Sequence, residues 1–245
     1  MTLVDLARNR HVSETVSVAL GREHRHDPVL ARTGGPAGNA VLTAWTGLVL
    51  LVLGVAELLT LINIRGLISW HVAVGALLIP PALAKTASTG WRIVRYYRAS
   101  PAYAEAGPPP LPLRLLGPVV VVSTLAVLAT GVALVVLGQD DSRQALVTAL
   151  GLRVDWITLH QAAFAVWATA TGLHLLTRIA SAARLTFLAD RSRAVPGGLG
   201  RLAVLALVLV SAVVLAVVLV RADGSWHQDR FDDDQASGSG RAAWR

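Results

Sequence analysis

Five long apolar runs, separated by short polar segments, set the pattern of this chain. They cover residues 40–63, 69–91, 115–137, 156–178 and 202–220. An α-helix rises about 1.5 Å per residue, so runs of this length cross a hydrocarbon core about 30 Å thick. The pattern predicts an all-α integral membrane protein with five transmembrane helices, four of them in a bundle core.

Composition and charge agree with that class and suggest an orientation. The 245 residues are 54% hydrophobic and only 15% charged, which is too apolar for an ordinary soluble domain. Most arginines lie in 1–39, 92–114 and 178–201, whereas 138–155 and the C-terminal tail are acidic. Because cytoplasmic loops carry the excess of basic residues, we expect a multi-pass plasma-membrane protein with its N-terminus cytoplasmic and its C-terminus outside. Membrane lipid is an expected partner, and nucleic acid is not.

The ends and connections have their own character. Residues 1–39 form a polar cytoplasmic arm, and 222–245 form an acidic tail that has too few apolar residues to fold alone. We expect the tail to be disordered outside the membrane. Pro80 and Pro81 are expected to kink the second span, and the loop 138–155 is expected to contain a short amphipathic turn.

The chain contains no cysteine. This rules out disulfides, cysteine-ligated iron–sulfur clusters and covalently attached c-type haem. A metal or haem must therefore be held by other side chains, and histidines inside the membrane are the first candidates.

The fourth run carries two histidines at a helical repeat. His160 and His174 are fourteen residues apart, so in a left-handed helix bundle they point from one face at depths about 21 Å apart. With the N-terminus inside, the second and fourth runs both pass from outside to inside. His71 and His160 then share the outer leaflet, and Lys85 and His174 share the inner one.

Two imidazoles at one depth on two helices suit axial ligation of a non-covalent b-type haem. An ionisable side chain in a bilayer costs on the order of 2.5–3.5 kcal/mol or more, so His71 and His160 need a reason to be there. The alternative is that the histidines only hydrogen-bond across helices or face a water-filled cavity. A ligating histidine needs its second N–H satisfied, and Ser69 and Thr158 are the expected partners. Gly75 would let a porphyrin lie close to the helix, although small residues also serve simple helix packing.

Lys85 is the only lysine in a chain whose other strong bases are arginines, and it follows His71 by fourteen residues. A buried lysine can lose its proton and offer a lone pair, which arginine cannot. Three roles remain open. Lys85 could ligate a second iron opposite His174, pair with a haem propionate or quinone oxygen, or extend along the kinked helix to the inner headgroups as a structural residue.

Glu57, toward the outer side of the first span, is the other charge inside the membrane runs. It could accept a proton during quinol oxidation or orient a ligand. It could equally pair with Arg65 near the interface.

The second and fourth spans resemble the four-helix core of bacterial membrane b-type cytochromes, the cytochrome b/b6 and bacterial cytochrome b561-like group. In the b/b6 branch, two helices each carry two histidines fourteen residues apart, and the matching positions here are His71, His160, His174 and Lys85. The run SWHVAVGALLIPPALAKTASTGWRIVRYY, followed by SPAYAEAGPPPLPLRLLGP, also resembles uncharacterised membrane proteins of high-GC actinobacteria that are often taken to be cytochrome b-like.

This resemblance implies respiratory electron transfer between quinone and a partner redox protein, sometimes a molybdopterin oxidoreductase outside the membrane. We therefore expect a membrane electron-transfer subunit with one or two non-covalent b-type haems. His71 and His160 would hold the outer haem, and His174, with or without Lys85, an inner haem or a quinone. Catalysis would belong to the complex. The alternative is a haem-free structural or anchoring subunit of a larger complex.

Overall fold

The computed structural model of this chain is built almost entirely from helices. It describes residues 13, 17, 27–107, 111–149, 151–187 and 195–222, so most of the predicted N-terminal arm and the tail from residue 223 lie outside the described residues. The elements are α2 (Gly35–Thr60), the 3₁₀ turn η1 (Leu61–Asn63), α3 (Ile68–Tyr97), α4 (Pro101–Ala106), α5 (Leu111–Ser142), β1 (Val147–Ala149), β2 (Leu152–Val154), α6 (Trp156–Phe187) and α8 (Gly198–Ala222).

Within the described part of the chain, four helices are long and apolar enough to cross a membrane. They lie at Gly35–Asn63, Ile68–Tyr97, Leu113–Ser142 and Gly198–Ala222. The chain is therefore a multi-pass membrane protein. The helix α6 has 32 residues, which is also enough to cross, but it is not one of these four helices. Its role as a fifth span stays a prediction.

Several helices are longer than the apolar runs from which they were predicted. Backbone hydrogen bonding does not stop where hydrophobicity stops, so α3 continues past its predicted end to Tyr97 and α2 begins at Gly35. Pro36 occupies the first turn of α2, where its missing amide proton costs nothing. Pro80 and Pro81 lie inside α3, and the helix continues on both sides of them.

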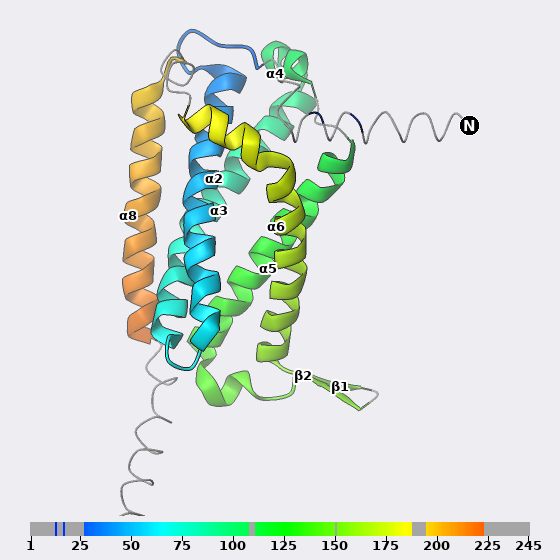
Figure 1. The fold of residues 1–245 in the computed structure, drawn as a ribbon, viewed down its shortest axis with the longest axis vertical. Coiled ribbons are helices and arrows are strands. Elements are labelled where there is room, and N and C mark those ends of the chain that lie inside the picture. Colours follow the sequence, from blue (N-terminus) through cyan, green and yellow to red (C-terminus); the bar gives the residue numbers. More distant parts are fainter. Residues whose placement is uncertain are drawn as a thin grey trace, which may run out of the picture.

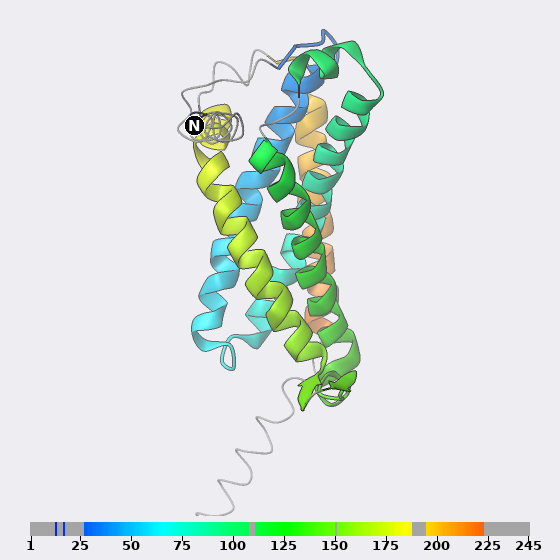
Figure 2. The same cartoon turned by 90° about the vertical axis from the view of Figure 1, so that its right-hand side faces the viewer.

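The long helices pack in an up-and-down order. The most extensive contacts join α2 to α3, α3 to α8, and α5 to α6, and smaller ones join α2 to α6 and α3 to α5. Successive long helices run in opposite directions (Figure 1), and Figure 2 shows the same order from the side. The helices α2, α3, α5 and α6 thus surround a common interior, in which α3 and α6 face one another diagonally. The helix α8 packs on the outer side of α3.

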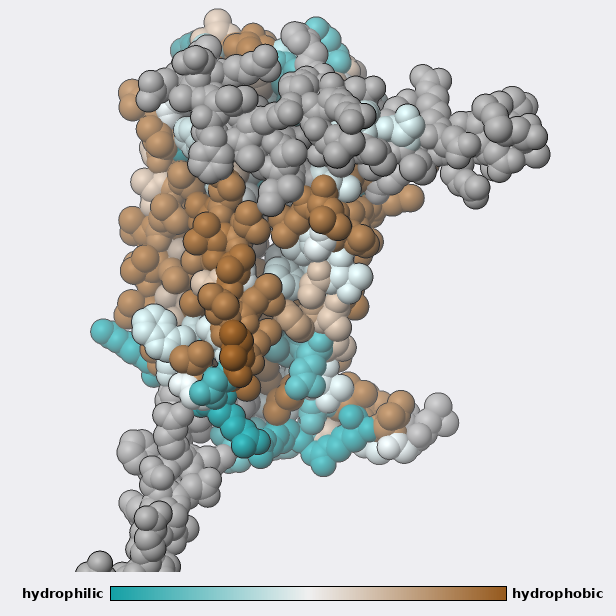
Figure 3. Space-filling view, viewed as in Figure 1, coloured by the Kyte–Doolittle hydropathy of each residue, from teal (hydrophilic) through white to brown (hydrophobic). Residues whose placement is uncertain are grey.

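One buried cluster joins three of the helices. Ala76 of α3, Val135 of α5 and Ala216 of α8 belong to one buried cluster, completed by Leu219. Small residues let helix backbones approach closely, which is how helices gain packing energy in lipid. Large apolar side chains instead point outward along α8, where Leu207, Val210, Val214 and Val218 are exposed. Figure 3 shows this apolar surface in brown along the helices and hydrophilic surface in teal at the end that carries the hairpin.

The connection between α5 and α6 corrects one expectation. In place of an amphipathic turn, the chain forms an antiparallel hairpin in which Val147 pairs with Val154 and Thr148 with Arg153. Gly151 at the tip has a φ of 76°, a left-handed conformation that glycine adopts without strain. Opposite residues in such a hairpin share a face, so one face carries valines and the other carries Thr148 and Arg153. The expected amphipathic turn is replaced by the hairpin because pairing between the two strands satisfies the backbone hydrogen bonds of residues 147–154.

Asp155 caps the start of α6. Its Oδ1 accepts hydrogen bonds of 2.8 Å from both the backbone amide and the hydroxyl of Thr158. These bonds favour the ionised carboxylate and lower the pKa of Asp155 below its ordinary value. Because the pKa is lowered in the folded state, the stabilisation is complete above the ordinary aspartate range and is lost as the pH falls through the lowered value.

We therefore expect Asp155→Ala to loosen the first turn of α6, because it removes the acceptor for the Thr158 amide. Amide hydrogen exchange at Thr158, measured in detergent micelles, should become faster. Asp155→Asn keeps a side-chain oxygen at the cap and is the matched control. Equal exchange rates in the alanine variant and the unmodified protein would contradict the assignment.

Candidate functional site

A cavity of about 1920 Å³ runs between α2, α3, α5 and α6. Its walls are mostly aliphatic and aromatic, with a few polar side chains. All six residues that the sequence singled out line it, namely Glu57, His71, Gly75, Lys85, His160 and His174. The structure thus brings the predicted site residues to one continuous space.

The heptad spacing explains why these residues share a cavity. On α6, the positions between His160 and His174 that follow the same stripe are Phe164, Trp167 and Thr171, and all five line the cavity. On α3, His71 and Lys85 likewise lie on one stripe that faces inward. The two-heptad interval therefore places each pair on one face of its helix, as the sequence analysis predicted.

His71 and His160 meet across this cavity. Their ring centres lie 6.3 Å apart, and their ring planes are inclined at 86°. The two residues come from α3 and α6, the diagonal helices, so the imidazoles approach one another through the interior and not through a helix–helix contact. The approach of the two rings agrees with the shared depth that the sequence analysis expected for His71 and His160.

The hydrogen bonds of His71 define its tautomer. Its Nδ1 lies 2.9 Å from Thr60 Oγ1 and 3.0 Å from Glu57 Oε1. Thr60 Oγ1 donates its own proton to the Glu57 carbonyl at 2.6 Å, so toward His71 it can only accept. Nδ1 therefore carries the proton that Thr60 Oγ1 accepts.

His160 is held in the same way by a different helix. Its Nδ1 lies 3.0 Å from Thr130 Oγ1 on α5. The Thr130 hydroxyl donates to the Ala126 carbonyl at 2.8 Å, so it too accepts from the imidazole. Both histidines thus bond a threonine hydroxyl through Nδ1–H.

One expected hydrogen-bond partner of the histidines, Thr158, needs correction, whereas Ser69 stays a prediction. The Thr158 hydroxyl donates to Asp155 at the start of α6, and not to a histidine ring as predicted. The threonines that hold the rings are Thr60 and Thr130, which the sequence analysis missed. A signal was available at Thr130, since it is a polar residue followed by a glycine in a span made mostly of Val, Leu and Ala.

Glycines make room for the polar side chains. A Cβ on Gly131 would lie 3.3 Å from His160 Cε1, and one on Gly75 would lie 3.3 Å from Glu57 Oε1. The absence of a side chain at Gly75 therefore accommodates the Glu57 carboxylate, where the sequence analysis considered either a porphyrin or simple helix packing. The role of Glu57 stays a prediction.

Lys85 contacts α2 through its ammonium group. Its Nζ donates to the Thr43 carbonyl at 2.9 Å, and a Cβ on Gly47 would lie 2.8 Å from Nζ. The side chain thus turns toward the neighbouring helix and the cavity. Its role as an iron ligand stays a prediction, as does that of His174, which lines the same cavity.

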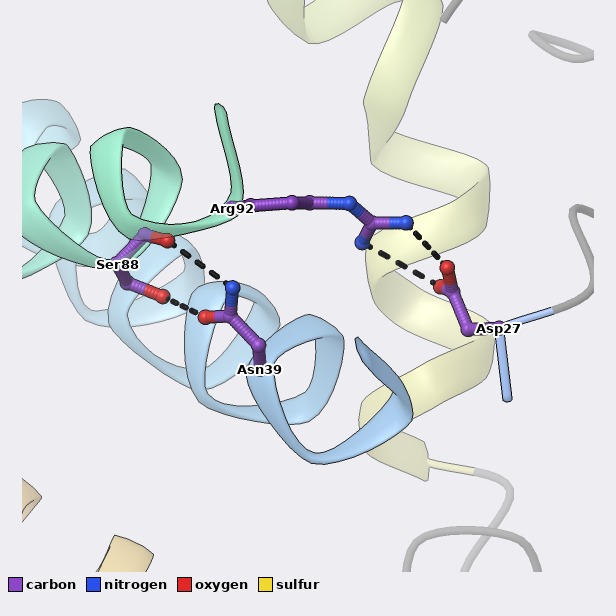
Figure 4. A network of polar contacts seen from close by, with 4 residues as sticks. All are labelled: Asp27, Asn39, Ser88 and Arg92. Atoms are coloured by element: carbon purple, nitrogen blue, oxygen red, sulfur yellow. Dashed lines mark hydrogen bonds and ion pairs between the residues drawn. The ribbon is translucent and has the colours of Figure 1, made fainter. Parts of the chain in front are cut away.

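Hydrogen bonds between polar side chains also join α2 to α3 on the far side of Lys85 from His71. Asn39 Nδ2 donates to the Ser88 carbonyl at 3.0 Å, and the Thr43 and Ser88 hydroxyls are 2.8 Å apart. Arg92 pairs with Asp27 at the same end of the helices (Figure 4). These contacts fix the register between α2 and α3, and therefore the position of Glu57 relative to His71.

The site is defined by a pair of nitrogen donors. Among the residues that the structure describes, no group of three or more His, Cys, Asp or Glu side chains is arranged to hold a metal ion.

Comparisons of the chain with models of protein families, with curated proteins and with solved structures found no match.

The close approach of the two rings can be tested by cross-linking. Because the chain has no cysteine, the double variant His71→Cys/His160→Cys introduces two unique thiols. A short bis-maleimide is expected to join them in membranes, and mass spectrometry of the digested protein detects the product.

The matched control is His71→Cys/His174→Cys, in which the second thiol lies about 21 Å further along α6. That pair should give little product with the same reagent. Equal yields from the two pairs would show that His71 and His160 do not share a depth.

Proposed function

We propose that this chain is a membrane electron-transfer protein that holds a b-type haem between His71 and His160. The observation that carries the proposal is the approach of two imidazoles from diagonal helices, with ring centres 6.3 Å apart. Both rings line a largely apolar cavity between four helices. His71 and His160 would therefore hold the iron of a non-covalent haem.

The separation of the two rings supports the proposal. Their centres lie 6.3 Å apart, and the rings come from helices on opposite sides of the cavity. His71 and His160 would therefore be the residues that hold the haem, which would supply the redox chemistry.

The surrounding residues would serve the same purpose. Thr60 and Glu57 hold the His71 ring, and Thr130 holds the His160 ring, so neither imidazole needs to reorganise before binding. Phe164 and Trp167, whose rings lie 6.0 Å apart, contribute an aromatic wall that limits access of water. A bound haem b supplies a centre that accepts and releases one electron.

The finer assignments follow from the sequence and form part of this proposal. The arginine-rich ends of the helices face the cytoplasm of a plasma membrane, and the chain passes electrons between quinone and a partner redox protein, such as a molybdopterin oxidoreductase. His174 and Lys85, at the other end of the cavity, would serve an inner haem or a quinone. The dimensions of the cavity support this extension, since about 1920 Å³ exceeds the 300–1,000 Å³ of usual ligand pockets.

A pyridine haemochrome assay on protein expressed with sufficient haem tests the proposal. We expect about one haem or more per chain, and loss of most of that haem in both His71→Ala and His160→Ala, because each variant removes an axial nitrogen. His174→Ala is the control and should keep the haem bound between His71 and His160. Purified protein without any haem would instead support a structural or anchoring subunit.

Glycine variants test the same site without removing a ligand. Gly131→Val should lower haem content by at least half, because a side chain there meets the His160 ring at 3.3 Å. Gly117→Val on the same helix is the matched control, since a Cβ at Gly117 has no atom within 4 Å. Equal haem content in the two variants would contradict the assigned position of His160.

A further inference from the structure

We propose that Glu57 is a positioning residue that makes the two axial histidines electrostatically unequal and lowers the reduction potential of the bound haem. The inference rests on the proposed haem site. It concerns how this chain regulates that site, which neither the spacing of the histidines nor their ring distance addresses.

Glu57 reaches His71 from the neighbouring helix α2. Its Oε1 lies 3.0 Å from His71 Nδ1, and the two side chains are only 14% and 20% exposed. Gly75 provides the space on α3, because any side chain there would begin 3.3 Å from the same oxygen. The carboxylate is thus placed at His71 by the close packing of two helices.

A merely structural role would not need a carboxylate. Thr60 already accepts the Nδ1 proton at 2.9 Å, so the tautomer of His71 is set without Glu57. Among the described residues, Oε2 of Glu57 is buried without a hydrogen bond. Burying a carboxyl group that is only partly hydrogen-bonded is costly, which points to a use for this group at His71.

The charge acts on whatever His71 ligates. A carboxylate that accepts Nδ1–H raises the basicity of the imidazole, and therefore the electron density that Nε2 donates. Its negative charge also favours the more positive, oxidised state of a metal across the ring, and it acts strongly because little water screens it. Glu57 should therefore hold the reduction potential below the value that two neutral hydrogen bonds would give.

His160 provides the internal comparison. Its Nδ1 is bonded by the neutral hydroxyl of Thr130 at 3.0 Å, with no carboxylate in contact among the described residues. The two ligands thus differ in the charge of their partners while sharing a threonine hydrogen bond. Thr130→Val removes a neutral partner, whereas Glu57→Gln removes a charge and keeps an acceptor of the same shape.

The experiment is a redox titration of the b-type absorbance at one fixed pH. We expect Glu57→Gln to shift the midpoint to a more positive potential with haem content retained, and Thr130→Val to shift it by a smaller amount. A midpoint equal to that of the unmodified protein, or a shift no larger than that of Thr130→Val, would overturn the inference. Absence of haem from the unmodified protein would instead remove the proposed function.

The electron paramagnetic resonance spectrum of the oxidised protein gives a second readout, since it reports the angle between the imidazole planes. Glu57→Asp keeps the charge but shortens the side chain, so the His71 ring should turn and the spectrum should change. This variant decides the positioning role if Glu57→Gln accumulates without haem. A spectrum identical to that of the unmodified protein would show that Glu57 does not position His71.

Discussion

The cost of burying ionisable side chains between apolar helices is the constraint on which this structure depends. In a medium without water, each such group must find its partner on another helix. The described contacts follow that rule: Glu57 of α2 meets His71 of α3, Thr130 of α5 meets His160 of α6, and Lys85 donates to a carbonyl of α2. The polar residues therefore fix which helices are neighbours and in what register.

Close helix approach makes these contacts geometrically feasible. Each polar side chain lies against a glycine of the adjacent helix, in the pairs Glu57 with Gly75, Lys85 with Gly47, and His160 with Gly131. The two diagonal helices α3 and α6 are left to face one another across a cavity, and it is there that His71 and His160 meet. The site is thus a consequence of how the four surrounding helices pack, and it needs no direct contact between the helices that carry the rings.

The spacing of residues along single helices was sufficient to predict much of the candidate site. His71 with Lys85, and His160 with His174, share a stripe because fourteen residues complete two heptads, and both stripes line the cavity. The partners of the rings were harder to predict. Thr60 and Thr130 lie on other helices, so the spacing of residues along α3 or α6 could not predict them. Sequence proximity favoured Thr158, which instead serves the start of its own helix.

By itself the sequence determined that this is a helical membrane protein, roughly where its long helices lie, and which positions of α3 and α6 face inward. Those features depend on local hydrophobicity and on the fixed rise and turn of an α-helix. Only the tertiary structure decided that His71 and His160 approach to 6.3 Å, that Glu57 reaches His71, and that the loop before α6 is a hairpin. Those features depend on the register and rotation of one segment against another, which local patterning does not encode.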